Sequence, residues 1–125
     1  MGVWHRGSGR TSTGSRIKRF RSKRKYELGR TPTETVMGEP KQRIVDSHGR
    51  HKKKPALSIK EVNVTDPVKN ITYRAVIEDV EENKASMDYQ RRKVMTRGTI
   101  IKTSKGRAKI TSRPGQEGIL NAVLI

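Results

Sequence analysis

The residues of this chain that could do chemistry are mostly cations, and they crowd into one short tract. Seven of the eleven residues from Arg16 to Tyr26 are Lys or Arg. Each phosphate that such a side chain neutralises releases counterions, so a polyanion binds there without its sequence being read. Arginine also forks onto phosphate groups and stacks on bases, whereas lysine acts as a point charge. The tract therefore predicts binding to nucleic acid.

Aromatic side chains lie among these cations. Trp4, Phe20 and Tyr26 are three of the five aromatic residues in the chain. Unstacked bases stack on such rings with about 1–3 kcal/mol each. RNA contact is therefore favoured over the alternatives, a solvated charge tract or a localisation signal. Glycines and hydroxylated residues between Gly7 and Ser15 predict an open backbone that can approach phosphates, or else an ordinary flexible leader.

Two further basic clusters lie later in the chain, at residues 50–54 and at 91–93 with Arg97. The first falls between two predicted strands, which predicts a protruding loop, and loops on a rigid scaffold suit contact with irregular RNA. The alternative for each cluster is a plain solvated surface. The residues predicted to contact RNA are Trp4, His5, Arg6, Arg10, Arg16, Lys18, Arg19, Phe20, Arg21, Lys23, Arg24, Lys25, Tyr26, Arg30, Arg50, Lys52, Lys53, Lys54, Arg91, Arg92, Lys93, Arg97 and Arg113.

No catalytic, metal or cofactor site is predicted. Gly9 and Gly14 have the spacing of a phosphate-binding loop, but Ser15-Arg16 stands where that loop requires Lys followed by Ser or Thr. His48 and His51 lie three positions apart but have no third metal ligand nearby, His5 is isolated, and the chain has no cysteine. The acidic residues of 78–82 fit a solvated face, without an oriented catalytic partner. We therefore expect neither an enzyme nor a protein with a small-molecule substrate.

The overall charge supports a polyanionic partner. The chain carries 29 Lys and Arg against 12 Asp and Glu, a net charge of +17. Such a charge repels itself unless a partner neutralises it. An anionic membrane is the rival to nucleic acid, but a spanning helix needs about 20 apolar residues and the apolar runs here are a few residues long. With no signal core at the first residues either, we expect a cytoplasmic protein without a membrane partner.

Apolar residues divide the chain into two regions. Residues 1–43 contain 5 of the 25 Leu, Ile, Val and Phe residues, and residues 44–125 contain the other 20. The first region cannot bury enough apolar surface to offset about 1–2 kcal/mol of backbone ordering per residue. We therefore predict an extended basic N-terminal arm over 1–43, disordered when free, and a small domain over 44–125.

The second region is predicted to be mainly β, because 17 of its 20 large aliphatic residues are Val or Ile. Residues 71–77 alternate apolar and polar side chains, residues 99–111 fit a hairpin around Gly106, and residues 119–125 fit a closing strand. A bend is expected near Lys60, one short helix after Asn83 or Ser86, and a turn at Pro114. Five to six short strands with one short helix predict a small barrel or sandwich.

Several stretches also resemble a known family, the S-eight-e family of archaeal and eukaryotic small-subunit ribosomal proteins. The stretches that carry the resemblance are residues 1–5, 23–30, 32–35, 63–67, 106–118 and 121–124. The resemblance implies a structural constituent of the small ribosomal subunit, located in the cytoplasm. It implies ribosomal RNA and neighbouring ribosomal proteins as partners, and a barrel-like body with an RNA-binding arm. A general nucleic-acid-binding protein of chromatin type is the alternative that the charge alone leaves open.

Overall fold

The structure is a computed structural model that describes residues 2–4 and 7–125, and the chain forms two compact units. The N-terminal unit is Met1–Pro32 and the second, which we call the barrel unit, is Thr33–Ile125. His5, Arg6 and the side chain of Trp4, all predicted to contact RNA, lie outside the described part of the chain.

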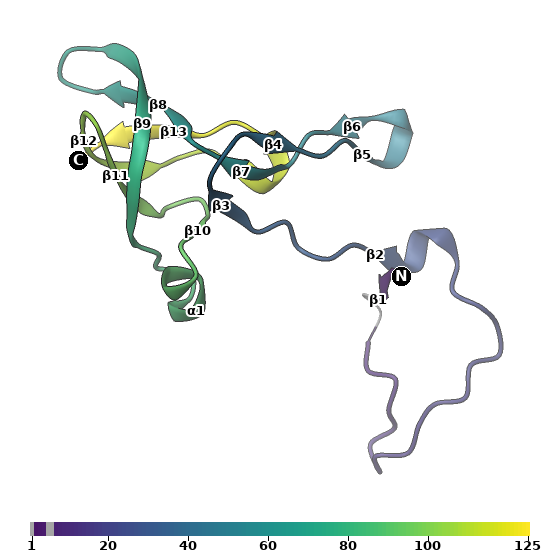
Figure 1. Ribbon diagram of the computed structural model, residues 1–125. Helices are drawn as coiled ribbons and strands as arrows, with labels where there is room; N and C mark the ends of the chain where they lie inside the picture. Colours follow the sequence, from purple (N-terminus) through teal and green to yellow (C-terminus); the bar gives the residue numbers. More distant parts are fainter. Residues whose placement is uncertain (1, 5–6) are drawn as a thin grey trace. The chain divides into compact units, whose positions relative to one another are not determined.

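The barrel unit is built around a closed five-stranded barrel in the strand order β11-β12-β13-β8-β9 (Figure 1). This confirms the prediction of a mainly β fold with a small barrel, although the described residues form two short α-helices where one was expected. The barrel strands are β8 (Glu61–Asp66), β9 (Ile71–Glu82), β11 (Ile100–Thr103), β12 (Gly106–Ile110) and β13 (Asn121–Leu124).

The alternation predicted for residues 71–77 builds the longest strand, β9. Its partners β8 and β11 run antiparallel to it, and Ala75 and Ile77 point inward beside Val62 and Val64. These buried side chains are small or β-branched, which suits the narrow interior of a five-stranded barrel. The expected bend lies at Lys60, where the chain passes from one sheet into the barrel.

The two ends of the barrel sheet meet through the last strand. β13 pairs in parallel with β8, with Ala122 opposite Val64, and antiparallel with β12. The backbone N–H of Ile125 also donates to the Arg107 carbonyl at 3.1 Å. The C-terminus is thus held in the sheet, as its apolar composition predicted.

A second sheet covers residues on both sides of the predicted domain boundary. Its order is β10-β3-β7-β4, with bounds β3 (Thr35–Met37), β4 (Lys41–Gln42), β7 (Ala56–Ile59) and β10 (Val94–Met95). The buried Thr35 hydroxyl donates to the Ala56 carbonyl at 2.7 Å. The compact unit therefore begins at Thr33, whereas the sequence placed the boundary after residue 43. Disorder of the arm in the free protein stays a prediction.

Two short helices interrupt the strands. α1 (Met87–Arg91) begins at Ser86, whose hydroxyl accepts from the Asp88 N–H at 3.2 Å, as one of the two predicted caps. The turn expected at Pro114 is instead α2 (Pro114–Glu117). Pro114 occupies the first helical position, and the left-handed Gly118 follows the last one. The two residues bound a single helical turn, where the sequence predicted a simple turn.

The remaining described elements are short. In the N-terminal unit β1 (Val3–Trp4) pairs with β2 (Leu28–Gly29), and a 3-10 turn, η1 (Lys25–Glu27), precedes β2. In the barrel unit β5 (Val45–Asp46) and β6 (Lys52–Lys53) form a hairpin around the 3-10 turn η2 (His48–Arg50). Figure 1 shows this hairpin extending away from the barrel beyond β4 and β7.

Candidate nucleic-acid interface

The basic tract of the N-terminal unit lies at the surface. Most of its residues are exposed from Arg16 onward, and Phe20 and Tyr26 are 92% and 71% exposed. Apolar rings in water gain free energy when a flat partner covers them. The tract thus combines cations with exposed aromatic side chains, a combination that suits contact with unpaired bases.

One cation of the tract is held by an acid. Arg21 donates two hydrogen bonds to the Glu27 carboxylate, at 2.8 and 3.0 Å, and the backbone N–H of Arg24 donates a third at 3.0 Å. The Glu27 side chain is only 6% exposed. The hydrogen bond with Glu27 raises the pKa of Arg21 further above its ordinary value. Arg21 therefore fixes the shape of the tract as well as adding charge.

The glycine-rich segment before the tract is folded back on itself. Backbone bonds from Thr11 N to the Ser15 carbonyl and from Ile17 N to the Gly9 carbonyl, both 2.9 Å, close a small hairpin. Arg10 and Arg16 face each other across it. The sequence predicted an open backbone here, but the chain reverses direction at Gly14, which has a left-handed conformation (φ +86°). Two like charges directly opposite are unfavourable, so an anion between them would stabilise the hairpin.

The second basic cluster forms the projecting hairpin of β5 and β6, where a loop was expected. Residues 41–54 contain six Lys and Arg and one acidic residue. Lys52 and Lys53 pair with Asp46 and Val45 along the hairpin and are exposed, and Arg50 lies in the turn with a φ of +63°. The Lys53 ammonium donates to the Gln116 Oε1 at 2.8 Å, which braces the hairpin against α2.

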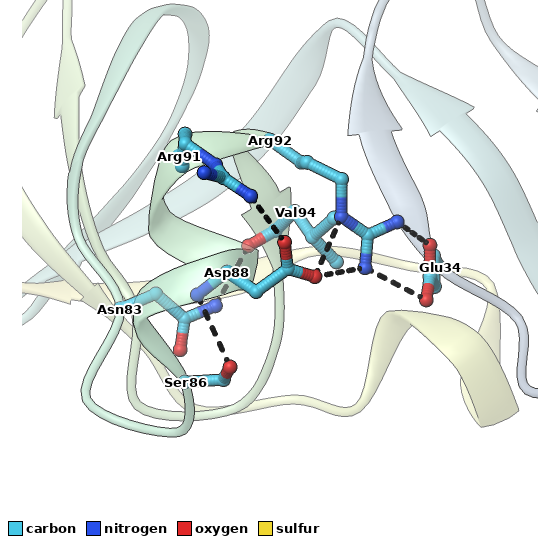
Figure 2. A network of polar contacts seen from close by, with 7 residues as sticks. All are labelled: Glu34, Asn83, Ser86, Asp88, Arg91, Arg92 and Val94. Carbon is cyan, nitrogen blue, oxygen red and sulfur yellow. Dashed lines mark hydrogen bonds and ion pairs between the residues drawn. The ribbon is translucent and has the colours of Figure 1, made fainter.

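The cations of the third cluster, residues 91–93, form ion pairs with acids. Figure 2 shows Arg92 between two carboxylates: its Nη1 donates to Glu34 at 2.5 Å, and its Nε donates to Asp88 at 2.9 Å. The hydrogen bond with Glu34 raises the pKa of Arg92, and the Tyr89 ring lies 5.4 Å from its guanidinium carbon. Arg91 also reaches Asp88, at 3.2 Å.

Other cations of the barrel unit have acidic partners too. Lys93 lies 2.6 Å from Asp79, and this hydrogen bond lowers the pKa of the Asp79 carboxyl. Because its pKa is lowered in the folded protein, the Asp79 carboxylate stabilises the fold at pH values above the ordinary carboxyl pKa. That stabilisation is lost as the pH falls through the lowered pKa. The further pairs are Arg74–Glu61, Lys102–Glu78, Arg107–Glu81 and Arg113–Glu117. The sequence showed these charges but not their pairing.

Substitution of Arg92 tests whether this residue has a structural role. We expect Arg92→Met to lower the melting temperature more than Arg91→Met, since Arg92 bridges Glu34 and Asp88 whereas Arg91 contacts Asp88 alone. Thermal unfolding followed by circular dichroism measures the difference. Equal melting temperatures for the two variants would mean that the bridge to Glu34 adds no stability.

The predicted residues are thus distributed over two units. Those from Arg10 to Arg30 lie in the N-terminal unit, and those from Arg50 onward lie in the barrel unit. Within the barrel unit the structure separates the projecting hairpin from the ion-paired residues of α1. Arg97, also predicted, lies before Gly98 between β10 and β11 and is exposed.

Within residues 2–4 and 7–125, no group of three or more His, Asp or Glu side chains is arranged to hold a metal ion. Among the helices that the described residues form, none has the length and apolar character needed to cross a membrane.

Comparisons with known proteins cover both units. The sequence model of the family described as ribosomal protein S8e matches residues 4–125. The chain is 47% identical over 118 residues to the small ribosomal subunit protein eS8 of Halobacterium salinarum, covering 94% of each chain. It is 43% identical over 126 aligned residues to the protein of the same name from Methanococcus maripaludis, covering 100% of this chain and 98% of the relative. The same-named protein of Methanococcoides burtonii is 43% identical over 118 residues, or 94% of each chain.

Proposed function

Because the chain belongs to the ribosomal protein S8e family, we propose that it is a structural constituent of the small ribosomal subunit that binds ribosomal RNA. The family membership confirms the resemblance found in the sequence. The N-terminal unit and the hairpin of β5 and β6 are the proposed contact surfaces. Catalysis has no part in this role.

The observation that supports these surfaces is the local balance of cations and acids. On the barrel unit, acids neutralise cations of β9, α1, β11 and β12. The basic tract and residues 41–54 have a large excess of cations over acids. Phosphate would supply the missing anions, and the released counterions would drive binding.

Neutralising three cations of the tract tests the proposal in the full chain. We expect Arg16→Gln, Lys18→Gln and Lys25→Gln together to weaken binding to structured ribosomal RNA fragments. The slope of log affinity against log salt should become shallower by about 2–3, since each phosphate contact contributes about 0.7–0.9. Filter binding or fluorescence anisotropy at several salt concentrations measures both quantities.

A matched control removes the same charge elsewhere. Lys60, Lys84 and Lys109 are exposed cations of the barrel unit outside the basic clusters. Their triple change to Gln should leave most of the salt slope intact. The same slope for both triple variants would argue against the tract as a contact surface. Efficient displacement of the RNA by duplex DNA would favour a chromatin-type protein instead.

A further inference from the structure

The N-terminal unit contains a pocket that the charge pattern alone did not indicate. Its volume is about 540 Å³, which lies within the roughly 300–1,000 Å³ of typical ligand sites. The residues that bound it include Gly7, Gly9, Ile17, Lys18, Phe20 and Arg21. It therefore has apolar walls, a basic side and an approachable glycine backbone.

Hydrogen bonds hold several lining residues of this pocket in place. Glu27 also borders the pocket and fixes the Arg21 guanidinium through two hydrogen bonds. The guanidinium carbon of Arg21 lies 5.4 Å from the centre of the Phe20 ring, close enough for a cation–π contact. The bond from Ile17 N to the Gly9 carbonyl joins the two segments that line the pocket. The ring is thus positioned, although it is almost fully exposed.

The chemistry of the pocket selects a particular part of RNA. A base in an A-form helix is covered by its stacked neighbours, and the deep major groove excludes side chains. Within RNA, a base that has left the stack is therefore the part whose flat face can cover the Phe20 ring. Lys18 and Arg19 at the pocket supply positive charge for the phosphate of the same nucleotide.

We propose that this pocket binds one unstacked nucleotide of a bulge or loop, with its base on Phe20 and its phosphate toward Lys18. The inference rests on the proposed RNA-binding function and names the part of the RNA that the N-terminal unit recognises. Most of the affinity still comes from phosphate contacts, and the pocket adds a preference for irregular RNA over duplex.

The test uses the full chain and two hairpin RNAs that each contain one 2-aminopurine. In one RNA a uridine pairs with the 2-aminopurine, and in the other this uridine is left out, so that the 2-aminopurine is bulged. We expect Phe20→Ala to weaken binding of the bulged RNA by about 5- to 150-fold and to change binding of the paired RNA little. The salt slope should stay the same because no charge is removed. The change in 2-aminopurine fluorescence on binding should be lost in this variant.

Two other variants serve as controls. Phe20→Tyr keeps a ring in the pocket and should retain the preference for the bulge. Met87→Ala removes an exposed apolar side chain that does not line the pocket and should leave the preference unchanged. Equal losses for Phe20→Ala and Met87→Ala, or equal losses on both RNAs, would overturn the pocket while leaving RNA binding in place. Absence of salt-dependent binding to either RNA would instead refute the proposed function, and the pocket with it.

Discussion

Changing Asn83 to Asp is expected to destabilise the barrel unit by about 2–4 kcal/mol, although the two side chains have nearly the same shape. Asn83 is only 3% exposed. Its Nδ2 donates to the Val94 carbonyl at 2.8 Å, and its Oδ1 accepts from Ala85 N at 3.0 Å and from the Thr96 hydroxyl at 3.2 Å. An aspartate oxygen cannot donate to the Val94 carbonyl, so two hydrogen-bond acceptors would face each other. The negative charge of the aspartate would also be buried.

Urea unfolding at neutral pH measures this loss, and pH gives an internal check. Burial raises the pKa of a carboxyl group, so the folded variant binds a proton more readily than the unfolded one. The gap in unfolding free energy between variant and parent should narrow as pH falls, because the protonated group can again donate to Val94. Asn63→Asp is the matched control, since Asn63 is an exposed barrel residue. Equal stability of the two variants at neutral pH would contradict the buried role of Asn83.

Much of the barrel could be predicted because its signals are local. Alternation over residues 71–77 predicts β9, and Gly106 marks the hairpin of β11 and β12 with Thr103 opposite it. Ser86 lies before a helix with an acid in its first turn, as helix caps do. In each case neighbouring residues determine the backbone, so the pattern can be read directly from the sequence.

The features that escaped prediction depend on residues far apart in the chain. β13 pairs in parallel with β8 across some sixty intervening residues, and no local pattern specifies that partner. Thr35 belongs to the compact unit because its hydroxyl finds the Ala56 carbonyl. Glu34 and Arg92 are separated by 58 positions and meet only in the folded chain. Charge composition alone could not distinguish Arg92 from a cation available to RNA.

The ion pairs of the barrel unit reduce the number of cations that we propose as RNA contacts. The sequence predicted contacts at Arg91, Arg92, Lys93 and Arg113 on charge alone, yet each of these cations has an acidic partner in the barrel unit. An RNA phosphate would have to compete with that partner, and breaking an existing ion pair offsets part of the gain. The basic tract and residues 41–54 contain few acids, so the RNA contacts that we propose there would face less of this competition.

Gly118 packs against the chain directly after β6, where the projecting hairpin ends. Gly118→Ala is expected to lower the free energy of unfolding by about 2–4 kcal/mol. Gly118 ends α2 with a φ of +73°, a conformation that side-chain-bearing residues rarely adopt. A Cβ added there would overlap the carbonyl oxygen of Lys54, directly after β6. The Gly118 carbonyl also accepts from Gln42 Nε2 at 2.9 Å, so the chain cannot move aside without breaking that bond.

Gly98→Ala separates the two causes of this loss. Gly98 has a similar φ of +89°, but no atom outside its own neighbourhood lies within 4 Å of the added Cβ. It should therefore cost only the backbone strain of about 1–2 kcal/mol. Thermal unfolding should order the melting temperatures as parent, Gly98→Ala and Gly118→Ala, with each kcal/mol lowering the midpoint by about 4–8 °C. If the two variants melted together, overlap with the Lys54 carbonyl would contribute nothing to the loss of stability.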